Sequence, residues 1–179
     1  MMKLHIIHDY KSIHPELRGK ELTDALICDC LGRDDAVIER TEKGKPYVSG
    51  GPFISVSHSE DTFALLVSDR EAGLDIQYAR NAKTDKIAAR YFTDEEAGQA
   101  AADETSDRFF ELWTRKEAYG KYVGTGLEQI MKKEQVLERD DVRFTDFRLE
   151  DGCFCCVCTG TEEGDQTDEI QISYGEQNR

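Results

Sequence analysis

The sequence predicts an α+β fold, and three observations support this prediction. Short apolar runs separated by Gly, Ser and Asp turns, as in β-strands, fill residues 36–78 and 142–173. Apolar residues recur at helical spacing before the first of these regions and between the two. The chain has 179 residues, which suits one ordinary domain or two small halves that share a core. We therefore expect two α+β halves, residues 1–70 and residues 71–179, that meet near residues 68–73.

The N-terminal half begins with a predicted first or edge strand over residues 4–10. His14-Pro15 then opens a helix, because proline is favoured in the first helical turn, and Gly32 ends it. Short strands follow, separated by polar turns. The buried stripe of the helix is Leu22, Ala25, Leu26 and Cys30, and the predicted strands are 36–40, 46–48, 53–57, 62–67 and 73–78.

The last of these strands, 73–78, already belongs to the C-terminal half, and helices follow it. Apolar residues between Ile87 and Phe92 recur at helical spacing, and Thr93-x-x-Glu96 is a capping box that opens another short helix. Ser106 or Asp107 caps the next helix, which runs to about Val123, where Gly124-Thr125-Gly126 stops it. Strands over 142–149, 153–158 and 169–173 are expected to form an antiparallel meander, with Asp151-Gly152 as a hairpin turn.

Composition excludes several classes of protein. A net charge of -14 argues against a general nucleic-acid binder, which needs a basic surface. No segment approaches the roughly 20 apolar residues of a membrane span, and no export signal is visible. The six cysteines are poorly spaced for a secreted disulfide framework. We expect a soluble cytoplasmic protein.

Four of the cysteines cluster at residues 153, 155, 156 and 158. On one strand their thiols would project to both faces, unlike the thiols of a Cys-x₂-Cys zinc loop. The interpretation as small buried strand residues, with one or two exposed thiols, is therefore favoured over a metal site.

Two motifs carry carboxylates that suit a metal ion. Gly73-Leu74-Asp75-Ile76-Gln77 lies on a predicted strand, so Asp75 and Gln77 face one side. On the following helix, Trp113, Glu117 and Lys121 are spaced by four and share a face. Asp75 and Glu117 are hard oxygen ligands of the kind that Mg²⁺ prefers, provided that strand and helix meet. The alternative for Glu117 and Lys121 is an ordinary ion pair on a helix surface.

Two further motifs suit a phosphate. Gly44-Lys45-Pro46 places a lysine beside a rigid backbone, and residues 55–59, with Ser57 and His58, form a hydroxyl-rich strand end. The alternatives are a simple turn for the first motif and a satisfied strand-end histidine for the second.

The order of these motifs resembles that of the 4'-phosphopantetheinyl transferases, specifically the surfactin-synthetase-activating type with two similar halves in one chain. The resemblance covers roughly residues 14–130. The motifs that carry it are Gly44-Lys45-Pro46, then Phe53 to Ser59, then Gly73-Leu74-Asp75, then Phe110-x-x-Trp113-x-x-Lys116-Glu117-Ala118-x-x-Lys121.

This resemblance implies a fold of two similar α/β halves packed with pseudo-twofold symmetry, with the metal site in the C-terminal half. It implies transfer of the 4'-phosphopantetheine arm from coenzyme A to a serine of an acyl or peptidyl carrier protein. Adenosine 3',5'-bisphosphate is released, Mg²⁺ is the cofactor, and neither a nucleic acid nor a membrane is a partner.

The resemblance also implies roles for particular residues. Asp75 and Glu117 would hold Mg²⁺, and Glu117, directly or through a metal-bound water, would accept the serine proton. Lys121 and Lys116 would pair with the diphosphate. Gln77 stands where the family often has Glu, so it would offer a neutral oxygen to the metal.

Residues of the N-terminal half would bind the rest of coenzyme A. Lys45 and Pro46 would line the adenine pocket, and Ser57 and His58 would contact phosphates. Arg18 or Lys20 would reach the 3'-phosphate, although this half is shorter here than in longer family members. The full set of expected coenzyme A contacts is Arg18 or Lys20, Lys45, Pro46, Ser57, His58, Lys116 and Lys121.

Two alternatives stay open. Gln77 keeps a non-catalytic coenzyme A-binding interaction module possible, and a structural protein with chance matches is a third class. An acidic carrier would be repelled by the overall charge of this chain, so a local basic or apolar patch is needed for docking.

Overall fold

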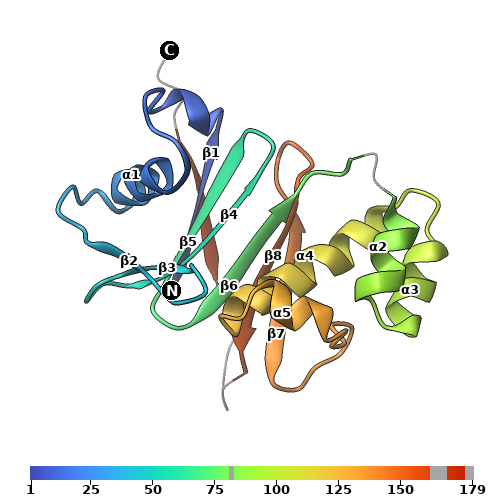
Figure 1. The fold of residues 1–179 in the computed structure, drawn as a ribbon. Helices are drawn as coiled ribbons and strands as arrows, with labels where there is room; N and C mark the ends of the chain where they lie inside the picture. The colour runs from blue at the N-terminus through green and yellow to red at the C-terminus, as the bar shows by residue number, and fades with distance from the viewer. Residues whose placement is uncertain (81–82, 162–168, 176–179) are drawn as a thin grey trace. The chain divides into compact units, whose positions relative to one another are not determined.

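The computed structural model describes residues 1–80, 83–161 and 169–175. These residues form two compact units (Figure 1). The first contains Met1–Glu71 and the described C-terminal strand, and the second begins at Ala72. The chain has a mixed α/β architecture, as predicted.

The first unit is built on a four-stranded sheet with strand order β4-β5-β1-β9. Strand β1 lies inside this sheet, antiparallel to β5 and parallel to β9. It is therefore the first strand of the chain, as predicted, but it is not an edge strand. Helix α1 packs on this sheet through Leu22, Leu26 and Ile27. The elements are β1 (Met2–His8), the 3-10 helix η1 (Tyr10–Ser12), α1 (Gly19–Leu31), β2 (Ile38–Arg40), β3 (Pro46–Val48), β4 (Phe53–Ser59), β5 (Thr62–Ser68) and β9 (Ile170–Tyr174).

Helix α1 begins later than predicted. His14 and Leu17 close a separate turn, with the amide of Leu17 donating to the carbonyl of His14 at 3.0 Å. Arg18 is then extended, so the helix starts only at Gly19. Its end is as predicted, because Gly32 adopts the left-handed conformation at φ 61°.

The second unit is built on a three-stranded antiparallel sheet with order β6-β8-β7. The predicted meander was wrong in its last strand, since the segment near residue 170 pairs with β1 in the first unit. Strands β6 and β7 occupy both edges of β8, so no edge of β8 remains for a further strand. The strands are β6 (Ala72–Gln77), β7 (Val142–Arg148) and β8 (Phe154–Gly160).

The helices of the second unit surround a cluster of aromatic side chains that includes Phe92, Phe109 and Phe154. The capping box of Thr93 and Glu96 is confirmed. Helix α4 begins at Asp107, so Ser106 has the predicted cap position, but its side chain makes no capping hydrogen bond. The carboxylate of Asp103 accepts from the amide of Arg108 at 2.7 Å in the first turn instead. The helices are α2 (Thr84–Tyr91), α3 (Asp94–Ala101), α4 (Asp107–Tyr122) and α5 (Leu127–Met131).

Helix α4 packs closely against the sheet at Gly73. A Cβ atom at this position would lie 1.9 Å from the carbonyl oxygen of Ala118 and 2.6 Å from the amide nitrogen of Tyr122. Glycine therefore lets the backbone of α4 lie directly on β6. Glu117 and Lys121 flank Ala118 on this helix, so the contact brings them to the strand that carries Asp75. Figure 1 shows helix α4 beside strand β6.

The clustered cysteines are buried on and beside β8. Cys153, Cys155, Cys156 and Cys158 are each at most 2% exposed, and all four are free thiols. This confirms their interpretation as small buried strand residues, but the expectation that one or two of the thiols are exposed was wrong.

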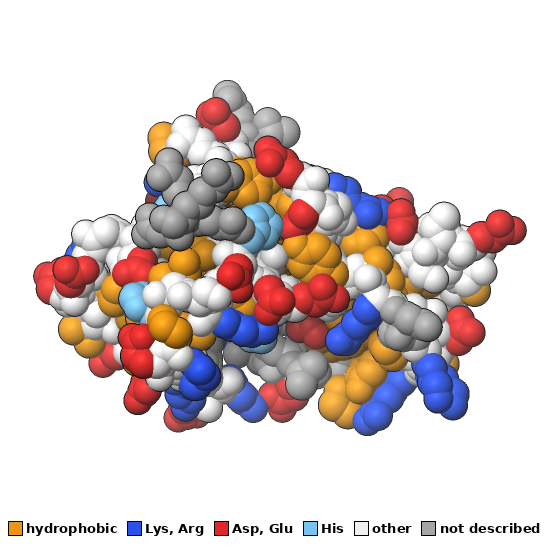
Figure 2. Space-filling model, turned by 90° about the horizontal axis from the view of Figure 1, so that it is seen from above, with side chains coloured by type: hydrophobic (Ala, Val, Ile, Leu, Met, Phe, Trp, Pro, Cys, Tyr) orange, Lys and Arg blue, Asp and Glu red, His pale blue; other side chains and the backbone are white. Residues whose placement is uncertain are grey.

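Charged side chains are mixed on the face of the molecule drawn in Figure 2. Asp and Glu side chains lie among Lys, Arg and hydrophobic groups on this face. In the described part of the chain, no helix has the length and apolar character that a membrane crossing requires.

Candidate active site

Asp75 and Lys121 form the centre of the candidate site. Asp75 lies on β6 and is 6% exposed, and the ammonium of Lys121 on α4 donates to its carboxylate at 2.7 Å. Leu74 and Ile76, the neighbours of Asp75, enter the core as predicted. Lys121 therefore pairs with a residue on the neighbouring strand. An ordinary ion pair on the helix surface would instead join two residues of α4.

Glu117 is the second carboxylate of the site. Its pKa is raised to about 7, mainly by burial and also by the negative charge of Asp75, while the charge of Lys121 opposes the shift. Asp75 and Glu117 therefore act on one another electrostatically. Two such carboxylates share one lysine, and this arrangement favours the binding of a further cation.

Gln77 ends β6 two residues beyond Asp75. It is half-buried, and its side-chain nitrogen donates to the carbonyl of Tyr78 at 3.0 Å. Among the residues that the structure describes, no three His, Cys, Asp or Glu side chains are grouped to hold a metal. This donor set still fits Mg²⁺, which commonly takes one or two protein carboxylates and fills its shell with substrate phosphate oxygens and waters.

Lys116 has different surroundings from Lys121. Its side chain is 2% exposed and pairs with the fully buried carboxylate of Glu96 at 2.8 Å. Its ammonium also donates to the carbonyl of Glu134 at 2.6 Å, and burial lowers its pKa. The predicted diphosphate contact of Lys116 is thus without support from the geometry. Glu96 was expected only as a capping residue, because a partner twenty positions along the chain leaves no local signal.

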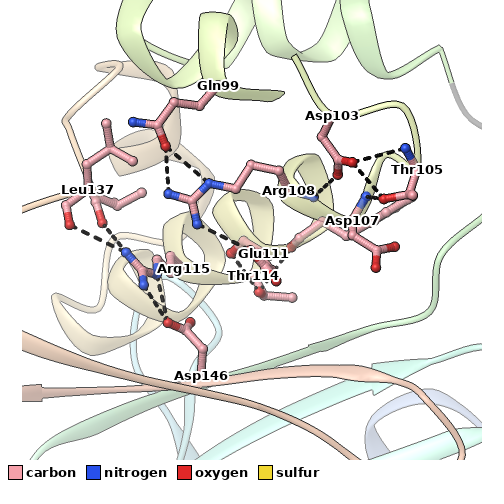
Figure 3. Close-up of polar contacts among 12 residues, drawn as sticks. Gln99, Asp103, Thr105, Asp107, Arg108, Glu111, Thr114, Arg115, Leu137 and Asp146 are labelled. Carbon is pink, nitrogen blue, oxygen red and sulfur yellow. Dashed lines mark hydrogen bonds and ion pairs between the residues drawn. The ribbon is translucent and has the colours of Figure 1, made fainter. Parts of the chain in front are cut away.

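Arg115 on α4 makes polar contacts that were not predicted from the sequence. Its guanidinium donates to the carboxylate of Asp146 on β7 at 2.6 Å and 2.9 Å (Figure 3). It also donates to the carbonyls of Val136 and Leu137. Lysine and arginine are common on helix surfaces, so the sequence alone does not indicate that Arg115 has these partners.

The first unit contains a cavity of about 430 Å³ near several predicted coenzyme A contacts. Lys20 from α1, Pro46 from β3 and His58 from β4 line it together. Tyr10 and Phe63 add aromatic surface. These residues combine an apolar wall with groups that can bind a phosphate.

Three other predicted contacts of the first unit have different surroundings. The ammonium of Lys45 pairs with Glu71 at 3.1 Å. Ser57 is buried, on the face of β4 opposite to that of His58, because side chains alternate along a strand. Arg18 turns back to donate to the carbonyls of Pro15 and Leu17, so of the two residues predicted for the 3'-phosphate only Lys20 lines the cavity.

The two units define a class of protein before any comparison. One unit carries two carboxylates and a lysine at a strand–helix contact, and the other carries a cavity with basic and aromatic walls. Such groups suit a protein that binds a phosphorylated ligand with the help of a divalent cation.

Comparisons with known proteins identify the family. The sequence profile of the 4'-phosphopantetheinyl transferase superfamily matches residues 71–174, and this chain belongs to that superfamily. It is 31% identical over 160 residues to a 4'-phosphopantetheinyl transferase of Bacillus subtilis, covering 84% of this chain and 70% of the relative.

Two other relatives are matched over shorter segments. The 4'-phosphopantetheinyl transferase gsp of Aneurinibacillus migulanus is 33% identical over 123 residues, covering 65% of this chain and 51% of the relative. The 4'-phosphopantetheinyl transferase Sfp of Bacillus subtilis strain 168 is 30% identical over 102 residues, covering 54% and 45%. The chain thus spans about half the length of these two relatives.

Proposed function

We propose that this chain transfers 4'-phosphopantetheine from coenzyme A to a serine of an acyl or peptidyl carrier protein in the cytoplasm. The observation that supports this best is the meeting of Asp75, Glu117 and Lys121 at the contact of β6 with α4. Membership of the superfamily supports the same reaction. The two units would be the similar halves of the family fold, related by pseudo-twofold symmetry.

Asp75 and Glu117 would hold Mg²⁺, with Gln77 as a neutral third contact. When bound, the ion neutralises negative charge on the diphosphate. Lys121 adds a positive charge to the same carboxylates and is placed to pair with a phosphate oxygen that enters the site.

The reaction is a displacement at phosphorus. The serine oxygen forms a bond to the phosphorus that carries pantetheine, and the bond from this phosphorus to the bridging oxygen breaks. Adenosine 3',5'-bisphosphate leaves with the bridging oxygen, and Glu117 accepts the serine proton. Because Glu117 would also hold the ion, a water molecule would relay this proton from the serine to the carboxylate.

The cavity of the first unit would bind the adenosine 3'-phosphate portion of coenzyme A. Tyr10 and Phe63 would offer apolar surface to the base, and Lys20 and His58, which line the same cavity, would bind a phosphate. The coenzyme A contacts of Lys45, Ser57 and Arg18 stay predictions.

The test is a transfer assay with a fluorescent coenzyme A derivative, Mg²⁺ and a panel of apo carrier proteins, read by gel fluorescence and mass spectrometry. We expect labelling of at least one carrier, its loss in EDTA, and its loss in Asp75→Ala and Glu117→Ala. Coenzyme A binding without labelling of any carrier would instead favour the non-catalytic binding module.

A further inference from the structure

A buried ion pair lies directly beside the proposed site in the sequence. Lys116, which precedes Glu117, contacts the carboxylate of Glu96 at 2.8 Å, and the two side chains are 2% and 0% exposed. Buried pairs of this kind seldom add stability over an apolar pair, but in some proteins they fix one geometry. The position of this pair therefore calls for a specific explanation.

The carboxylate of Glu96 contacts three nitrogen donors. One carboxylate oxygen accepts from the amide of Thr93 at 2.8 Å and contacts Lys116, and the other accepts from the amide of Val136 at 2.7 Å. Lys116 also donates to the carbonyl of Glu134. The pair thus ties the start of α3, the middle of α4 and residues 134–136 to one another.

Arg115 holds the same segment through a different face of α4. Its guanidinium donates to the carbonyls of Val136 and Leu137 and to Asp146 on β7 (Figure 3). Successive helical side chains point about 100° apart, so Arg115 and Lys116 restrain α4 in two directions. The side chain of Glu117 points in a third direction, about 100° from that of Lys116.

The rotation of α4 decides where the carboxylate of Glu117 lies. A side-chain tip lies ~6 Å from the helix axis, so a rotation of about 20° displaces it by about 2 Å. A displacement of that size is enough to separate a metal ligand from its ion. The contacts of Lys116 are therefore suited to hold Glu117 toward Asp75.

We propose that Lys116 and Glu96 are positioning residues whose buried pair sets the rotation of α4 and so aims Glu117 at Asp75. This proposal rests on the proposed function and replaces the diphosphate contact expected for Lys116. To reach a phosphate, the ammonium would have to leave both Glu96 and the carbonyl of Glu134.

The test is a double-mutant cycle of Lys116→Met and Glu96→Gln. Lys132→Met is the matched control, because Lys132 is an exposed lysine of the same unit whose ammonium donates to Gln129. The readouts are Mn²⁺ affinity of the protein alone by electron paramagnetic resonance, coenzyme A affinity by calorimetry, and kcat and KM of transfer.

We expect Lys116→Met to weaken Mn²⁺ binding and lower kcat by at least about tenfold, with coenzyme A affinity changed by less than about threefold. The double variant should lose no more Mn²⁺ affinity than the more affected single variant, because both single changes remove the same contact. Lys132→Met should match the wild type. If Lys116→Met does not fold, the double variant is compared with Glu96→Gln.

Two results would overturn the proposal. One is a tenfold loss of coenzyme A affinity in Lys116→Met that Glu96→Gln does not repair, since that marks a direct phosphate contact. The other is Mn²⁺ affinity equal to wild type in the double variant or in all folded variants, since the site is then aimed without the pair. A wild-type protein that transfers nothing would refute the proposed function, while the Mn²⁺ measurements would still decide on the positioning.

Discussion

Gly73 is the position at which the site is most sensitive to a single added carbon. In Gly73→Ala the new Cβ would lie 1.9 Å from the carbonyl oxygen of Ala118, whereas ordinary contact begins at 3.4 Å. Both contacting atoms belong to backbone, so α4 and β6 must separate by about 1.5 Å. The contact between Lys121 and Asp75, now 2.7 Å, would lengthen to about 4 Å, beyond a hydrogen bond.

We expect Gly73→Ala to lower the free energy of unfolding by about 3 kcal/mol, at the upper end for overpacking, because a rigid backbone cannot give way as a side chain can. Transfer activity should fall more than stability alone accounts for. Urea unfolding gives the first quantity, and the carrier-labelling assay under conditions where the variant is folded gives the second.

Gly98→Ala is the matched control for Gly73→Ala. Gly98 lies in helix α3, and a Cβ there would meet nothing within 4 Å. Alanine at this position should stabilise the protein by about 0.5 to 1 kcal/mol. The reasoning about close packing fails if Gly73→Ala unfolds at the same urea concentration as the wild type and labels carriers at the same rate.

Three further predictions concern charge and burial. Because the folded pKa of Glu117 is raised from 4.5 to about 7, its stabilising effect is complete below the unfolded value and is lost as pH rises through this range. In EDTA the free energy of unfolding should therefore fall more between pH 4.5 and pH 7 in the wild type than in Glu117→Gln, as measured by urea unfolding. Lys116→Met should cost about 3 to 5 kcal/mol in the same measurement, since it leaves Glu96 buried and unpaired, and the double variant with Glu96→Gln should cost less. Burial raises the pKa of the Cys156 thiol well above its usual range, so in the folded protein iodoacetamide should modify the half-buried Cys28 before Cys156, and peptide mass spectrometry would show equal rates only in urea.

Local sequence signals predicted most of the elements. The capping box at Thr93 and Glu96 satisfies backbone groups within one turn, and Gly32 ends α1 through its own conformation. Both depend on residues a few positions apart, so the sequence displays them directly. The alternation around Asp75 likewise placed Leu74 and Ile76 in the core.

Contacts between distant segments set the limit of those predictions. The segment near residue 170 alternates like a meander strand, yet β1 offers it a free edge and β8 does not. Helical spacing placed Glu117 and Lys121 on one face, but it does not show that Lys116 meets α3 rather than a ligand. The direction that each helical side chain faces depends on which elements pack around the helix, and the sequence alone does not state this.

The charges at the β6–α4 contact explain why the proposed site would bind a cation and why Gln77 would be compatible with one. Asp75 and Glu117 carry two negative charges when ionised, and Lys121 supplies one positive charge. The excess negative charge is relieved either by a proton on Glu117 or by a bound cation, and this competition makes cation affinity rise with pH. A third carboxylate at residue 77 would add to the repulsion that already raises the pKa of Glu117. An amide there leaves two charged ligands, which still lie within the one or two that Mg²⁺ commonly takes from a protein.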